Sequence, residues 1–344
     1  MGKTRNASFE LLRIICMFMI VYYHLFVKID YISVIKSPVY STILYPLHIA
    51  VICFVLISGY FRIKLSCKRL LKFLVQVLFY NVLAYGIYVF SYGEFSLKDF
   101  FFSFLPFSHN QDLWFVRTYL MLMLISPILN KYLDYLVDHG VPINEICMMF
   151  AILIFISMYL GTFGNDSSLK EGKNIVNFIT IYFLGSEFRN KRFVPNISKK
   201  NILIMFLSFN FLFMLVVYFG YGTSLVSKLR TISWDYNSPL LVFNAGLFFL
   251  LFEKMSFSSS AILNIASSVF PIYLLHSNYN IQKFLWSFLH NLCGTGSIWL
   301  KYAFVSVIIM LICILLDKLF APIYNAITEC LYKSLIKYSL CNKL

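Results

Sequence analysis

The sequence is dominated by apolar runs of about the length that a helix needs to cross a membrane. A spanning helix takes about 20 predominantly apolar residues. Because 60% of the residues are hydrophobic and only 13% are charged, a water-soluble core could not hide this much apolar surface. We therefore expect an all-α, polytopic membrane protein in which residues 1–344 form a single domain. The ten predicted spans are roughly 8–27, 43–61, 70–92, 113–130, 146–161, 175–188, 202–221, 238–253, 262–280 and 298–320.

The positive charges predict how these spans are oriented. The formal net charge is +14, but the Lys and Arg residues lie in short connectors, which is the pattern that orients membrane helices rather than one that binds nucleic acid. With ten spans, a cytoplasmic N-terminus places both dense clusters, residues 62–72 and 189–200, in the cytoplasm. We therefore predict that both termini are cytoplasmic, with a short tail at about 321–344, and that no nucleic acid is bound.

Three further patterns argue against common classes of protein. The first apolar run follows a basic flank, as in a signal peptide, but it is long enough to span and no small-x-small cleavage site follows it. The eight cysteines show no Cys-x-x-Cys spacing, so we expect small packing residues rather than a disulfide framework or a zinc site. No His-Glu-x-x-His motif is present either, and we expect no metal.

The first predicted span contains three ionisable residues, Glu10, Arg13 and His24. Such groups are costly in a membrane and usually face the interior of a helix bundle. Arg13 and His24 are eleven positions apart, so a helix places them on one face about 16 Å apart along its axis. Glu10 lies three positions before Arg13, on nearly the same face. Either Glu10 and Arg13 form a structural pair with His24 at the interface, or the three form a functional stripe.

Other basic residues are also candidates. Arg117 follows Trp114 within the fourth predicted span, where a buried guanidinium binds a phosphate or carboxylate or pairs with an acid on a neighbouring helix. The basic cluster after the second span can bind the phosphates of a nucleotide cofactor, or it can be ordinary positive-inside charge that contacts anionic lipid. Its members are Arg62, Lys64, Lys68, Arg69 and Lys72.

Four motifs, taken in order, resemble the acyltransferase family 3 of integral membrane proteins, particularly those that O-acetylate bacterial surface polysaccharides. The first is the pairing of Arg13 and His24 in the first helix. The basic cluster departs from the Arg-rich pattern that members often carry after the second helix, although it keeps the basic character. The other three motifs are Phe54 to Phe61 with its Ser58-Gly59 turn, Leu113-Trp114-Phe115-Val116 leading to Ser126-Pro127-Ile128-Leu129, and Ala266 to Ser268 with Ile272 to His276.

This resemblance implies a bacterial plasma-membrane enzyme that moves an acetyl or other short acyl group from cytoplasmic acyl-CoA to a hydroxyl. The acceptor would be a cell-surface or lipid-linked polysaccharide, such as a capsule or exopolysaccharide. His24 would be the general base, because a neutral imidazole can take the proton of an attacking hydroxyl. An acyl-His intermediate stays open.

The resemblance also implies roles for the remaining candidates. Arg13, oriented by Glu10, would line the route of the pantetheine arm, and the basic cluster would hold the CoA phosphates. Arg117 and His276 are candidates to stabilise the tetrahedral intermediate. The competing interpretation is a transporter or flippase that moves a polysaccharide or lipid-linked sugar without acyl transfer, which a charged stripe along one helix would also suit.

Overall fold

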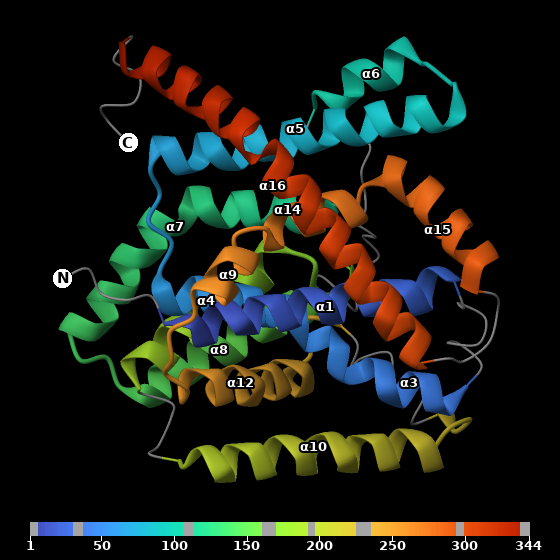
Figure 1. Cartoon of the computed structure of the whole chain (residues 1–344). Coiled ribbons are helices and arrows are strands. Elements are labelled where there is room, and N and C mark those ends of the chain that lie inside the picture. Colours follow the sequence, from blue (N-terminus) through green and yellow to red (C-terminus); the bar gives the residue numbers. More distant parts are fainter. Residues whose placement is uncertain are drawn as a thin grey trace. The chain divides into compact units, whose positions relative to one another are not determined.

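The computed structural model describes residues 6–29, 37–105, 113–159, 170–191, 197–224, 235–293 and 299–337, and every regular element in these ranges is helical. The chain divides into two compact units. The first unit contains residues 1–23, 31–63 and 118–263, and the second contains residues 24–30, 64–117 and 264–344. Helix α1 (Ala7–Ile29), the dark blue helix labelled in Figure 1, contributes residues to both units.

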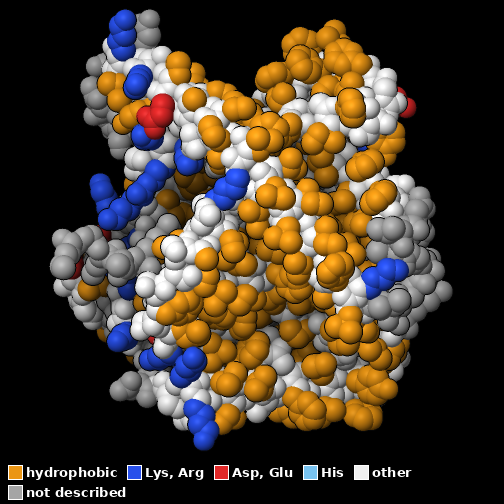
Figure 2. Space-filling view, in the orientation of Figure 1, with side chains coloured by type: hydrophobic (Ala, Val, Ile, Leu, Met, Phe, Trp, Pro, Cys, Tyr) orange, Lys and Arg blue, Asp and Glu red, His pale blue; other side chains and the backbone are white. Residues whose placement is uncertain are grey.

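Among the residues that the structure describes, six segments are long and apolar enough to cross a membrane. Their exposed side chains are largely hydrophobic, and such side chains cover much of the face shown in Figure 2. On the last of the six, the exposed apolar residues Phe304, Leu311, Leu315 and Leu319 recur at helical spacing, as expected of a face in contact with lipid. The six segments are α1, Pro38–Phe61 (α3 Pro38–Leu44, η1 Tyr45–His48 and α4 Ile49–Phe61), α5 (Cys67–Tyr92), α7 (Trp114–Asp138), α10 (Lys199–Phe219) and α16 (Trp299–Lys337).

Each of the ten predicted spans is largely helical within its described residues, but ten crossings are not confirmed. The fifth, sixth and eighth predicted spans are the short helices α8 (Ile143–Met158), α9 (Ile175–Asn190) and α12 (Pro239–Glu253). The ninth is not one straight helix, because Ser260–His276 and Tyr279–Leu289 meet at an angle of 83°. Counted as one span, this bent pair is the seventh segment that is apolar enough. It consists of α13 (Ser260–Ala266), α14 (Val269–His276) and α15 (Tyr279–Cys293).

Helix α16 is longer than the span predicted from the sequence. Its 39 residues extend over about 58 Å at 1.5 Å per residue, whereas the hydrocarbon core of a bilayer is about 30 Å thick. Residues 321–337, predicted as part of a tail, therefore continue the helix. Cys67, at the start of α5, is disulfide-bonded, which corrects the expectation that the cysteines serve for packing alone.

Small residues allow close helix packing in the first unit. Helix α4 packs against α9 and α12, and α12 also packs against α10. A Cβ atom added at Gly59 of α4 would overlap the backbone of Tyr182 in α9, and one added at Gly185 of α9 would overlap the backbone of Leu56 in α4. This close approach of two backbones is typical of membrane helices, whose association depends on van der Waals contact.

A buried carboxylate organises the second unit, in which α5, α14 and α16 pack together. Asp317 of α16 is 2% exposed. Its carboxylate accepts hydrogen bonds from the Tyr80 hydroxyl (2.7 Å), the Ser268 hydroxyl (2.6 Å) and the Tyr324 hydroxyl (2.9 Å). Since a buried carboxylate without donors would be strongly destabilising, these three hydroxyls fix α5 and the start of α14 against α16.

Candidate functional site

The second unit brings together two histidines that are 252 residues apart in the sequence. His24 lies near the end of α1, and His276 is the last residue of α14. The Nδ1 atom of His24 lies 3.2 Å from Nε2 of His276, and the two ring centroids are 5.2 Å apart. His276 is only 1% exposed, whereas His24 is half-buried.

The hydrogen bonds of His276 determine which nitrogens carry protons in the neutral pair. Nδ1 of His276 lies 2.7 Å from the backbone oxygen of Ile272. Because a carbonyl oxygen can only accept, Nδ1 is the protonated nitrogen and Nε2 is the acceptor. The short contact with His24 then requires a proton on Nδ1 of His24. In the neutral ring this leaves Nε2 of His24 as the basic nitrogen, which is the state a general base needs.

Neighbouring side chains hold both imidazoles in place. The Ser277 hydroxyl lies 3.1 Å from Nε2 of His276. On α1, the ring of Phe26 packs against Trp299 and Tyr302 of α16, with centroids 4.6 and 4.8 Å apart. The start of α14 is fixed by the bond between Ser268 and Asp317. The pair is therefore positioned at one end by aromatic packing and at the other by a buried hydrogen-bond network.

The first unit contains the acidic and basic members of the predicted stripe. Nη1 of Arg13 lies 3.1 and 3.0 Å from the two carboxylate oxygens of Glu10. The side chain of Glu10 is 6% exposed and that of Arg13 is 29% exposed. The predicted pairing of Glu10 with Arg13 is confirmed. Since α1 is continuous from Ala7 to Ile29, Arg13 and His24 lie about three turns apart on one helix.

Arg117 differs from its prediction. We expected a buried guanidinium, but Arg117 is exposed. It lies in the first turn of α7, where the preceding Val116 is buried instead. Successive residues of a helix point in directions about 100° apart, so burial of Val116 turns Arg117 away from the packed side. No ion pair is present between Arg117 and any acid in the described parts of the chain.

The basic cluster is divided between the two units. In the first unit, Arg62 forms an ion pair with Asp134 and donates to the Ser186 hydroxyl at 3.2 Å. In the second unit, Lys68 lies 2.5 Å from Glu329, and Arg69 donates to the backbone oxygen of Lys64 at 2.9 Å. Both residues, together with Lys64 and Lys72, are exposed and accessible to an anionic ligand, whereas Arg62 is half-buried and already paired.

Two residues of this site were missed in the sequence. Asp317 is an acid within the last apolar run, and such an intramembrane carboxylate is itself a signal. Ser277 directly follows the histidine of a motif, but nothing in the sequence shows that its hydroxyl turns back to that ring. Among the residues that the structure describes, no group of three or more His, Cys, Asp or Glu side chains is arranged to hold a metal ion.

Comparison with known proteins identifies the family. The model of the acyltransferase domain that defines acyltransferase family 3 matches residues 6–318. The match includes Arg13, His24, His276 and Asp317, and it ends within α16. No curated protein and no solved structure matches the chain.

Proposed function

Because the chain belongs to acyltransferase family 3, we propose that it transfers an acetyl or other short acyl group from acyl-CoA to a hydroxyl of a cell-surface or lipid-linked polysaccharide. Its family and its apolar helices identify it as a membrane acyltransferase. We place it in the bacterial plasma membrane with both termini in the cytoplasm. The bent pair and the short helices α8, α9 and α12 would complete ten spans.

The observation that carries the mechanism is the contact between His24 and His276. A sugar hydroxyl is a poor nucleophile at neutral pH, and a positioned base removes its proton as it attacks the thioester carbon. In the neutral pair, Nε2 of His24 is the nitrogen that can accept this proton. The oxygen–carbonyl bond forms, the carbon–sulfur bond breaks, and the proton held by His24 passes to the departing CoA thiolate.

His276 acts on the reaction through His24. Its Nε2 accepts from Nδ1 of His24, which holds the ring in the tautomer that leaves Nε2 basic and stabilises the imidazolium formed during transfer. This is the function that a carboxylate performs in a Ser-His-Asp triad. Both nitrogens of the neutral His276 ring are engaged, so this ring has no proton left to donate to the tetrahedral intermediate. We therefore assign His276 as a positioning residue.

The donor site is proposed at the basic end of α5. Exposed Lys64, Lys68, Arg69 and Lys72 would bind the CoA phosphates through charge-assisted hydrogen bonds. Arg13, held by Glu10, would line the route of the pantetheine arm toward His24. Arg62 contributes less in this proposal than the sequence predicted, because it is half-buried as well as paired with Asp134. The transport alternative has no support from the family match.

Binding of CoA separates an acyltransferase from a transporter, which has no reason to bind it. We expect CoA to raise the melting temperature of the purified protein. Replacing Lys68, Arg69 and Lys72 together by Gln should weaken CoA binding at least tenfold, since ionic hydrogen bonds contribute about 1.5–3 kcal/mol each. The matched control, Lys199→Gln with Lys200→Gln, removes two exposed lysines from the start of α10 and should leave CoA binding unchanged.

The acceptor side is tested on cells. Deleting the gene should remove an alkali-labile ester from the surface glycan, and restoring the wild-type chain should return it. Acyl transfer would be refuted if CoA did not stabilise the purified protein and deletion of the gene left the glycan esters unchanged. If the α10 control loses CoA binding and the triple variant does not, the donor site lies at residues 189–200 instead.

A further inference from the structure

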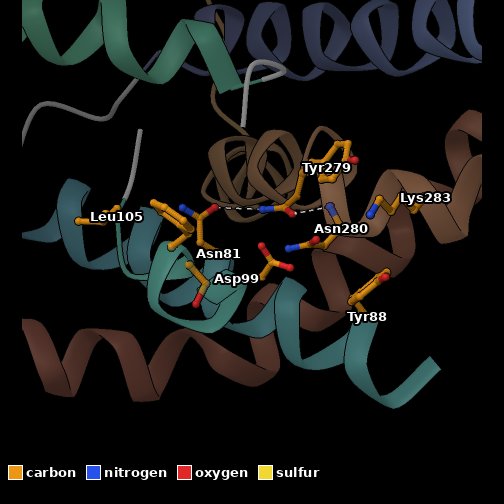
Figure 3. A pocket seen from close by; sticks show the side chains of 10 residues that line it. Asn81, Tyr88, Asp99, Leu105, Tyr279, Asn280 and Lys283 are labelled. Atoms are coloured by element: carbon orange, nitrogen blue, oxygen red, sulfur yellow. Dashed lines mark hydrogen bonds between the residues drawn. The ribbon is translucent and has the colours of Figure 1, made fainter. Parts of the chain in front are cut away.

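The second unit contains a cavity of about 290 Å³ that the proposed mechanism does not yet use. It lies between α5, the short helix α6 (Leu97–Ser103) and the start of α15. Figure 3 shows side chains from these three helices around the same space. Asn278, which lines the cavity, is two residues after His276, so the cavity borders the bend that follows His276. Its polar and aromatic walls include Asn81, Tyr88, Asp99, Asn278, Asn280 and Lys283.

Three asparagines form a fixed polar wall. The side-chain amide of Asn278 donates to the side-chain oxygen of Asn81 at 3.0 Å. The side-chain oxygen of Asn278 accepts from the backbone N–H of Asn280, also at 3.0 Å. Asn278 and Asn81 are both buried. These bonds use the oxygen of Asn81 and leave its two N–H groups as donors, and they leave the side-chain amide of Asn280 available to a ligand.

Asp99 brings a carboxylate to the opposite wall on a well-anchored helix. The Tyr85 hydroxyl donates to the backbone oxygen of Ser96 at 2.7 Å and accepts from the backbone N–H of Ser96 at 2.9 Å. The Ser96 hydroxyl caps α6 by accepting from the backbone N–H of Asp99. Within the described residues the Asp99 carboxylate forms no ion pair, and its side chain is exposed.

The third wall is aromatic. Nζ of Lys283 lies 5.0 Å from the ring centroid of Tyr88 and 4.6 Å from that of Tyr279, which are distances of cation–π interactions. The Tyr88 hydroxyl donates to Glu94 at 2.7 Å. The lysine is thereby held against the two rings and joins α5 to α15, and the rings offer flat apolar surface beside the amides and the carboxylate.

We infer that this cavity binds one neutral sugar unit of the acceptor, an inference that rests on the proposed function. Its volume lies at the lower limit of the roughly 300–1,000 Å³ of small-molecule sites, which suits one ring rather than an oligosaccharide. A carboxylate and amides supply the mixed acceptors and donors that a ring of hydroxyls requires. Asp99 offsets the charge of Lys283, so the cavity has no net positive charge that would favour a uronate or a phosphorylated sugar over a neutral one.

The test measures ligand binding without catalysis. Saturation-transfer difference NMR on the purified, detergent-solubilised protein would use methyl glucoside and methyl N-acetylglucosaminide as neutral probes and methyl glucuronide as the anionic probe. The neutral probes should give signals and the glucuronide should not. Asp99→Asn should weaken the neutral signal about tenfold, as expected for loss of hydrogen bonds to a charged acceptor. Asp138→Asn, which changes an exposed acid at the end of α7, is the matched control and should bind normally.

Asp99→Lys supplies a second test, because it places two positive charges at the cavity and should reverse the preference toward methyl glucuronide. His24→Ala separates the two proposals, since it should lose acyl transfer and still bind the neutral probes. Equal signals from the wild type and Asp99→Asn would overturn the sugar site, as would a wild type that prefers the glucuronide or gives no signal with any probe. None of these three results would affect the assignment of His24.

Discussion

The two ends of α1 each contain a polar side chain in an apolar helix, and they pair it in different ways. Near its start, the charge of Arg13 is balanced by Glu10, one turn away on the same helix. Near its end, the polar ring of His24 is held by His276, 252 residues later. The first pairing is ionic and local, whereas the second joins two imidazole rings and depends on a helix made near the end of the chain.

The difference distinguishes a local ion pair from the contact on which the proposed chemistry depends. An ion pair between neighbours on one helix keeps both side chains ionised. It stabilises a helix only modestly, by about 0.2–0.5 kcal/mol. A pair of neutral imidazoles, with its protons directed by the Ile272 carbonyl, leaves Nε2 of His24 unprotonated. The predictions below test whether chemistry is confined to the histidine end of α1.

The largest effect is expected from His24→Ala. Loss of a general base typically costs 10²–10⁴-fold, so transfer of labelled acetyl from acetyl-CoA to the glycan should fall by about a hundredfold or more. The melting temperature and CoA binding should be close to wild type. The control is His139→Ala, which removes an exposed imidazole at the end of α7. A folded His24→Ala protein with near wild-type transfer would refute the mechanism.

A smaller effect is expected at His276, where the choice of side chain decides the interpretation. His276→Ala should lower kcat by roughly tenfold to a hundredfold with little change in CoA binding, because it removes the acceptor that orients His24. His276→Gln, whose amide oxygen can replace Nε2 as the acceptor, should restore part of this loss.

A double variant tests whether His276 acts only through His24. If His276 acts only through His24, adding His276→Ala to His24→Ala should cause no further loss of turnover, because the two residues work as a unit. Additive losses would show that His276 contacts the reacting groups directly.

The smallest effects are expected at the other end of α1. Arg13→Gln should raise the KM for acetyl-CoA several-fold and lower turnover, since its charge is proposed to serve the donor path. Glu10→Gln keeps the shape of the partner and removes only its charge. It should change the KM for acetyl-CoA and the turnover by less than about threefold. Steady-state kinetics on both variants test this order. A Glu10→Gln defect as large as that of His24→Ala would make the stripe a single catalytic unit.

Much of the helical fold follows from the sequence, because apolar runs of spanning length predict helices directly. All ten predicted segments are largely helical within their described residues. The pattern does not show how a run is divided: residues 262–280 read as one span, yet the chain bends at Ser277 and Asn278. The side chains that stabilise this bend, including Asn81 and Ser277, bond to partners that hydropathy does not reveal.

The candidate site was predictable only in part, because hydropathy does not reveal which side chains meet across helices. The pairing of Glu10 with Arg13 follows from helical spacing alone. His24 and His276 were each singled out, but their contact depends on the packing of α14 against α16, which Asp317 organises. Arg117 failed as a buried candidate because a shift of one residue on a helix turns a side chain by about 100°, and a hydropathy window cannot resolve that difference.

The local and distant pairs of α1 also differ in when they can form during biogenesis. Synthesis runs from the N-terminus, so Arg13 can enter the translocon with Glu10 already beside it. His24 must enter the bilayer long before residue 276 has been made. A neutral imidazole can enter the bilayer at a far lower cost than a charged side chain, for which insertion at the centre of a helix costs about 2.5–3.5 kcal/mol. A histidine partner in place of a carboxylate extends this advantage to α14, because neither His24 nor His276 has to be inserted as an ion.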